Sequence, residues 1–227
     1  MSNTMGARRK AARGESDAAA LAELREFGEE PSRIGGAQCT ALQDLVRTQL
    51  EILGEDPDRE GLKKTPLRVS RAMAWLTRGY EMNVADVVGD AVFEEPHESM
   101  VMVRDVEFYS MCEHHMLPFY GRVHLAYIPR GHIVGLSKLP RIVEVFARRL
   151  QVQERLTEQV ADAIDGVLRP AGVGVVVEAY HLCMMMRGVQ KQASRTVTSS
   201  LKGSFRDDAR TRDEFLRLAY GSVPTGL

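Results

Sequence analysis

The stretch SMCEHHMLPFYGRVHLAYIP, residues 110–129, places four consecutive potential metal ligands directly before a strand pattern. Its second half, GRVHLAYIP, is rich in residues that favour strands and is flanked by Gly and Pro. The preceding residues 100–111, MVMVRDVEFYSM, have the same character. We therefore predict two strands, with the ligand-type residues at the junction between them.

The rest of the chain alternates between helix and strand patterns. Residues 137–150 and 154–170 are predicted helices, residues 173–188 and 194–203 are predicted strands, and residues 211–221 form a closing helix. The second of these helices carries an apolar stripe made of Leu156, Val160, Ile164, Val167 and Leu168. The order strand, strand, helix, helix, strand, strand predicts an α+β fold, with an antiparallel four-stranded sheet and two helices on one face.

The N-terminal part of the chain has a different composition. Residues 1–36 contain few large apolar side chains, and we predict that they are mostly disordered. The folded part is then expected to span residues 37–227. It should open with two helices, the first capped by Thr40 and ended by Gly54, the second opening at Thr65.

Composition excludes several classes of protein. The 227 residues are 44% hydrophobic, with 30 basic and 31 acidic side chains, whereas a general nucleic-acid binder is usually more basic. No apolar run approaches the ~20 residues that span a bilayer, and the N-terminus has no apolar core of a secretory signal. Three cysteines do not make a disulfide framework. We expect a cytoplasmic protein with reduced thiols and with neither nucleic-acid nor membrane partners.

The residues around Cys112 favour a zinc site. Cys112 and His115 are three residues apart, so a single turn brings both side chains to one side, whereas His114 is offset and should point elsewhere. If the strand over residues 173–188 stays regular, Cys183 shares a face with His181 and is the natural third ligand. Three protein ligands leave one tetrahedral position for water, which is typical of a catalytic zinc.

Other interpretations of the same residues are open at this point. A closed structural zinc site could use His114 or His181 as a fourth ligand. A nucleotide deaminase would need an H-x-E and a P-C-x-x-C pair, and the sequence contains neither in that form. A zinc-stapled interaction module without activity is the third interpretation.

Three long segments resemble the GTP cyclohydrolase I family. These are FYSMCEHHMLPFYGRVHLAYIP, GLSKLPRIVEVFARRLQVQERLT and GVGVVVEAYHLCMMMRGVQ, and the resemblance covers about residues 40–220. It implies a catalytic domain over residues 37–227 with the tunnelling fold, an antiparallel four-stranded sheet and two helices preceded by N-terminal helices. It also implies conversion of GTP and water to formate and 7,8-dihydroneopterin triphosphate, the entry step to folate and, in animals, tetrahydrobiopterin.

The resemblance also implies roles for individual residues. Zinc would be held by Cys112, His115 and Cys183. The catalytic residues would be His114, His181 and Ser137. The residues that bind GTP would be Gln153, Glu154, Lys138, Arg141, Arg187 and Arg68.

The resemblance further implies an assembly. Family members form homodecamers with active sites between subunits, and Arg68 would come from a neighbouring subunit. A regulatory protein is a further candidate partner, for which the residues themselves give no indication.

Overall fold

The computed structural model describes residues 37–221. The predicted disorder of residues 1–36 therefore lies outside the described residues. The chain divides into two compact units, residues 1–75 and 76–227, and each is described by itself.

Two helices make up the described part of the first unit. Helix α2 spans Ala37–Ile52 and α3 spans Thr65–Leu76. The predicted start at Thr40 was wrong, because Thr40 lies inside the helix, which is described from Ala37 onward. The predicted end was close, because Gly54 follows the helix with a φ of 84°, a conformation that glycine adopts without strain. Cys39 is a free thiol with its Sγ 3.4 Å from the Ser70 hydroxyl.

A five-stranded sheet organises the second unit. Its strands are β2 (Val101–Cys112), β3 (Pro118–Ile128), β5 (Leu150–Gln151), β6 (Gly172–His181) and β7 (Thr196–Gly203), in the order β5-β2-β3-β6-β7. The four predicted strands pair antiparallel, as expected. The fifth, β5, was not predicted. It pairs parallel to the end of β2, with Gln151 opposite Cys112.

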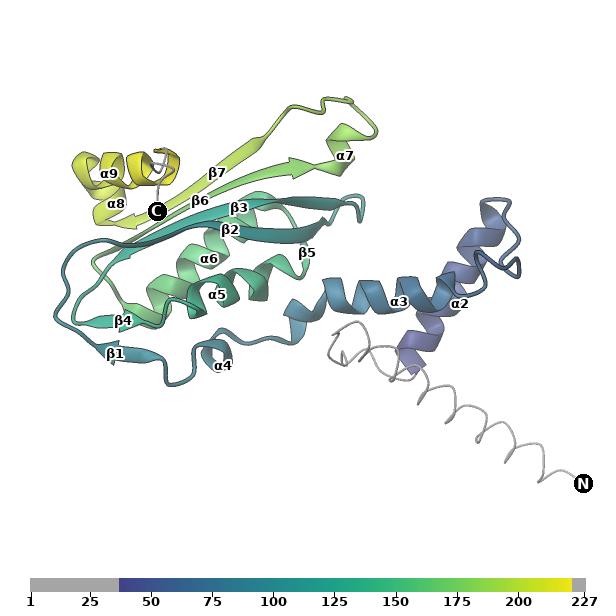
Figure 1. Ribbon diagram of the computed structural model, residues 1–227, viewed down its shortest axis with the longest axis horizontal. Coiled ribbons are helices and arrows are strands. Elements are labelled where there is room, and N and C mark those ends of the chain that lie inside the picture. Colours follow the sequence, from purple (N-terminus) through teal and green to yellow (C-terminus); the bar gives the residue numbers. More distant parts are fainter. Residues whose placement is uncertain (1–36, 222–227) are drawn as a thin grey trace, which may run out of the picture. The chain divides into compact units, whose positions relative to one another are not determined.

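Helices α5 (Lys138–Ala147) and α6 (Gln153–Leu168) lie side by side on one face of the sheet (Figure 1). The predicted apolar stripe of α6 is largely buried, and Leu156, Val160 and Ile164 are 0% exposed. These side chains pack in the same core cluster as the alternate β3 residues Phe119 and Val123. Full burial of one such side chain contributes about 1.5–3 kcal/mol, so this face anchors the sheet to the two helices.

A smaller cluster covers part of the opposite face of the sheet. Helices α8 (Ser204–Asp207) and α9 (Ala209–Tyr220) lie on this face (Figure 1). Phe205 and Phe215 pack there in one cluster with Val176 of β6. Gly174 permits this approach, because a Cβ there would lie 2.6 Å from the Phe205 ring. The C-terminal helix predicted over residues 211–221 is therefore present.

Short elements complete the second unit. They are η1 (Arg78–Glu81), α4 (Val84–Val88), the paired strands β1 (Val92–Glu94) and β4 (His132–Val134), and α7 (Leu182–Met185). None of the helices in residues 37–221 is long and apolar enough to cross a membrane.

Candidate metal centre

The turn between β2 and β3 presents the ligand-type residues. The Cys112 carbonyl accepts hydrogen bonds from the backbone N–H groups of His115, at 3.3 Å, and Met116, at 2.8 Å. Met116 closes the turn with a φ of 53°, an uncommon value for a residue with a side chain. The Glu113 N–H also donates to the Gln151 carbonyl, at 3.0 Å, which fastens the turn to the β5 edge of the sheet.

Cys112, His115 and Cys183 come together as predicted from the sequence. One ligand atom from each lies within 4.8 Å of the others. The Cys112 Sγ is 4.0 Å from the Cys183 Sγ and 3.9 Å from the His115 Nδ1. Zinc–sulfur bonds of about 2.3 Å in a tetrahedron place two sulfurs about 3.8 Å apart. Two thiols and an imidazole at these separations therefore fit a zinc ion.

Cys183 reaches this group by a different route from the one predicted. The prediction rested on the condition that the strand over residues 173–188 stays regular, but β6 ends at His181 and residues Leu182–Met185 form the helical turn α7. The Met186 N–H donates to the Leu182 carbonyl, so the backbone here bonds to itself and leaves the sheet. Cys183 is therefore delivered by a helical turn.

Burial and the nearby Cys112 both act on the Cys183 thiol. Burial raises the pKa of the Cys183 thiol, and the nearby Cys112 raises it further, while Arg187 acts in the opposite direction. A cation between the two sulfurs would favour both thiolates. The pair of thiols is therefore suited to holding a metal ion.

Neither alternative fourth ligand belongs to the three-residue group. His114 lies beside it, with its Nδ1 3.8 Å from the Cys112 Sγ, and its ring stands at 80° to the ring of His115. His181 instead bonds to a side chain of α6. Within residues 37–221, the group that could hold a metal has three members.

His181 has a fixed environment at the end of β6. Its Nε2 lies 2.8 Å from the Gln153 Oε1, and its ring stacks on Phe119 with a centroid distance of 4.7 Å and an interplanar angle of 2°. Burial lowers the pKa of His181, and Glu154 partly opposes this. Glu154 is exposed in the first turn of α6, where a carboxylate is favoured by the helix dipole.

Gln153 does not share the exposed position of its neighbour Glu154. Successive helix residues point about 100° apart, and Gln153 faces inward with only 1% of its surface exposed. Its side-chain amide bonds to His181, β6 and β7. The expected contact with substrate therefore stays a prediction, and it is restricted to the backbone of Gln153.

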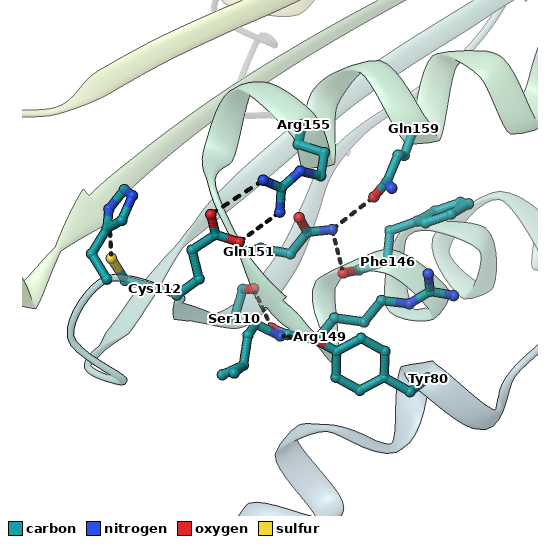
Figure 2. A network of polar contacts seen from close by, with 11 residues as sticks. Tyr80, Ser110, Cys112, Phe146, Arg149, Gln151, Arg155 and Gln159 are labelled. Carbon is teal, nitrogen blue, oxygen red and sulfur yellow. Dashed lines mark hydrogen bonds and ion pairs between the residues drawn. The ribbon is translucent and has the colours of Figure 1, made fainter.

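Glu113 has a partner on α6. It forms a two-pronged ion pair with Arg155 (Figure 2). The Arg155 hydrogen bond lowers the pKa of Glu113. This pair joins the turn that carries Cys112 to the first turn of α6.

The residues predicted to bind phosphate come from several elements of the chain. Ser137 and Lys138 lie at the start of α5, with Arg141 one turn further, while the end of that helix leads into β5 beside Cys112 (Figure 1). Lys138 donates one hydrogen bond to the Val87 carbonyl, at 3.0 Å, and keeps two further donors. Ser137 occupies the cap position without making a side-chain cap bond.

The remaining two cations belong to other elements of the chain. Arg187 is exposed just after α7, near Cys183. Arg68 is exposed on α3 in the first unit. The second unit therefore contains the metal group together with His114, His181, Glu154 and Arg187.

Two residues of this region could not be predicted from the sequence. Phe119 is opposite His181 in the β3–β6 register, which makes the ring stacking a direct result of strand pairing. Arg155 is separated from Glu113 by 42 residues. The only signal for it was a cation beside Glu154 at the start of a predicted helix.

Comparison with known proteins identifies the family. Residues 42–220 match the family model for GTP cyclohydrolase I. The chain is 56% identical over 198 residues to GTP cyclohydrolase 1 of Dictyostelium discoideum, which covers 86% of this chain and 85% of that protein. It is 60% identical over 177 residues to the Leptospira biflexa protein of the same name, and the match covers 78% of this chain and 97% of that protein. It is 59% identical over 169 residues to the Homo sapiens protein of that name, and the match covers 74% of this chain and 68% of that protein. The chain therefore belongs to the GTP cyclohydrolase I family and is an enzyme of this class.

Proposed function

We propose that this protein converts GTP and water to formate and 7,8-dihydroneopterin triphosphate, with a zinc ion held by Cys112, His115 and Cys183. The observation that carries the proposal is the convergence of these three side chains within 4.8 Å in a chain of this family. Two thiolates favour zinc over magnesium or calcium, which prefer oxygen ligands. When bound, the ion supplies Lewis-acid activation of water for attack on the purine C8.

His114 and His181 are the proposed proton-transfer residues. Both lie beside the metal group without belonging to it, so their imidazoles are available for proton transfer to the substrate. His181 protonates the ring nitrogen of the purine as the five-membered ring of the purine opens. His114 protonates the ribose ring oxygen as the ribose opens. Ser137 assists the later rearrangement of the sugar.

Glu154 is the proposed guanine-binding residue. Guanine presents two adjacent donors, the ring N1–H and the exocyclic amine, and one carboxylate can accept both. Glu154 is exposed at the start of α6, directly after the β5 residues that flank Cys112. Adenine has no N1–H, so it would leave the carboxylate incompletely paired, at a cost of about 1–3 kcal/mol. Gln153 completes the pocket through its backbone.

Lys138, Arg141, Arg187 and Arg68 are the proposed triphosphate-binding residues. Lys138 and Arg141 lie towards the end of α5 away from β5, whereas Arg187 lies near Cys183. A site that uses all of these residues is completed by a second copy of the chain. This supports a homo-oligomer, which we propose to be a decamer with active sites between subunits. The antiparallel sheet with α5 and α6 on one face supports the tunnelling fold, in which such sheets join.

The cellular role follows from the reaction. We propose that the enzyme works in the cytoplasm at the entry to a reduced-pterin pathway, folate or tetrahydrobiopterin. A regulatory partner protein is compatible with this role.

The test of the proposed function is a product analysis with purified protein, zinc and GTP. Formate equal to the GTP consumed, with all three phosphates retained on the product, is the expected result. Release of ammonia without formate would identify a deaminase instead. Absence of turnover with zinc bound would identify an inactive zinc-stapled module. ATP serves as the matched control, because it keeps the triphosphate and removes the guanine edge.

A further inference from the structure

The side-chain amide of Gln153 lies in a buried hydrogen-bond network between α6, β6 and β7. Its Nε2 is 3.0 Å from the Val177 carbonyl oxygen, 3.0 Å from the Thr196 carbonyl oxygen and 3.1 Å from the Thr198 Oγ1. Its Oε1 is 2.8 Å from the His181 Nε2. Gln153 is 1% exposed, so these protein groups determine how the amide is oriented.

The two carbonyl oxygens permit only one orientation of this amide. A carbonyl oxygen is an acceptor without a proton, and the amide NH₂ is a donor, so the NH₂ group must face Val177 and Thr196. The reversed amide would place its own oxygen 3.0 Å from both carbonyl oxygens. That arrangement has two pairs of facing acceptors in a buried site and no hydrogen bond.

The hydroxyl groups of the network agree with this orientation. The Thr157 hydroxyl donates to the backbone carbonyl of Gln153 at 2.7 Å, so the single proton of this hydroxyl is used. Thr198, whose Oγ1 is 2.6 Å from the Thr157 Oγ1, must then be the donor in that pair. The lone pairs of Thr198 remain available to accept from the Gln153 NH₂ group. Each donor in the network therefore meets an acceptor.

The orientation of the amide decides which nitrogen of His181 carries a proton. The Gln153 Oε1 can only accept, so the His181 Nε2 that faces it must be the N–H. Stacking on Phe119 at 4.7 Å holds the plane of the imidazole ring, and a half-turn of the ring would present a carbon to the oxygen. Among residues 37–221, the His181 Nδ1 has no hydrogen-bond partner.

We propose that Gln153 is a positioning residue that holds His181 as its Nε2–H tautomer, so that Nδ1 is the nitrogen that exchanges protons with the substrate. The functional part of this inference rests on the proposed role of His181 in the GTP reaction. The tautomer itself does not depend on that role. Gln153 thereby acts on the reaction through His181, without touching the substrate through its side chain.

The direct test is solid-state NMR of the zinc-loaded, sedimented full-length enzyme with ¹³C,¹⁵N-labelled histidine. The chain has 6 histidines, and the His181→Asn variant assigns the signals of His181 by difference. The expected result is a protonated Nε2 and an unprotonated Nδ1 at slightly alkaline pH. A protonated Nδ1 in the unmodified enzyme would overturn the proposal. This readout needs no turnover, so it stands apart from the test of the proposed function.

Two variants test the positioning role. Gln153→Met keeps the volume and removes the acceptor, and it should lose the tautomer preference and lower kcat by ~10- to 100-fold, with zinc content and the KM for GTP little changed. Thr198→Val is the matched control, because it removes one network bond but leaves both carbonyl acceptors for the amide. It should keep the Nε2–H tautomer and nearly full kcat. An unchanged tautomer and kcat in Gln153→Met, or equal losses in both variants, would refute the role of Gln153.

Discussion

Arg155 and Glu113 form a two-pronged ion pair, in which the guanidinium donates hydrogen bonds of 2.6 and 3.2 Å to the two carboxylate oxygens (Figure 2). Glu113 directly follows the proposed zinc ligand Cys112, and Arg155 directly follows the proposed guanine-binding Glu154. One contact thus connects the turn that carries the proposed zinc ligands to the helix end that carries the proposed guanine-binding residue. Its influence should be visible in metal binding, although neither residue belongs to the metal group.

Replacing Arg155 by Gln should weaken zinc binding while the fold is retained. The change frees the turn from α6, and loss of residues that support metal ligands typically costs 10- to 100-fold in affinity. We expect about a tenfold weaker affinity, because the backbone bonds of the turn persist. Competition with a chelator measures the affinity. Arg47→Gln is the matched control, since Arg47 makes a similar two-pronged pair with Asp58 in the first unit. Equal zinc affinity in the two variants would remove Arg155 from this role.

Replacing Cys183 by Ser should strongly reduce zinc content. The hydroxyl is a poor ligand for zinc in comparison with a thiolate, and two ligands bind more weakly than three. Elemental analysis of the purified protein measures the effect. Cys39→Ser is the control, because Cys39 lies in the first unit and is not part of the metal group. Full zinc occupancy and unchanged activity in Cys183→Ser would exclude Cys183 from the site.

Replacing Glu154 by Ala should raise the KM for GTP with normal zinc content. The variant loses both hydrogen bonds to the guanine edge, and we expect at least a tenfold loss in kcat/KM, equivalent to about 1.4 kcal/mol. Steady-state formate release measures this. Asp165→Asn offers a control carboxylate on the exposed side of the same helix. Unaltered GTP kinetics in Glu154→Ala would refute its assignment as the guanine-binding residue.

His124 should make the folded protein less stable as the pH falls below about 6.5, the usual pKa of histidine in unfolded chains. The residue is 5% exposed, and its Nδ1 accepts a hydrogen bond from the Asp105 N–H, at 3.3 Å. Burial lowers the pKa of His124, with Asp105 and Glu178 opposing and Arg104 and Arg122 adding to the effect. The ring of Tyr220 faces it from α9. The unfolded chain therefore binds a proton at higher pH than the folded chain, and stability is lost as the pH falls through 6.5.

The measurement is urea unfolding of His124→Asn and of the unmodified protein on both sides of pH 6.5. The unmodified protein should lose more unfolding free energy on acidification than the variant does. His132→Asn, at an exposed position of β4, should behave like the unmodified protein. Parallel pH curves for His124→Asn and the unmodified protein would contradict the prediction.

The main strands and helices could be predicted because their sequence patterns are local. The stripe of Leu156, Val160 and Ile164 has helical spacing, and burial of these side chains confirmed it. Strand β5 could not be predicted, since two residues are too short for any periodic pattern. The end of β6 was misplaced because the run LCMMM is apolar whether it continues a strand or forms the turn of α7.

The spacing of Cys112 and His115 and the resemblance of the surrounding segments predicted the members of the metal group. The partners of neighbouring residues could not be predicted, because they depend on distant segments. Gln153 and Glu154 are adjacent in sequence, yet one faces β7 and the other is exposed, and only the direction in which α6 packs decides this. The ion pair of Glu113 depends in the same way on the contact between the turn and α6.

The central claim is that His114 and His115 are neighbours with different functions, one outside the metal group and one within it. The most direct measurement is the zinc content and formate release of His114→Ala and His115→Ala, purified and assayed side by side. We predict that His115→Ala loses both zinc and activity. His114→Ala should keep its zinc and its assembly but lose turnover by ~10²-fold or more, the usual scale for a general acid. Equal loss of zinc in the two variants would contradict the account, because it would make His114 a fourth ligand that closes the site.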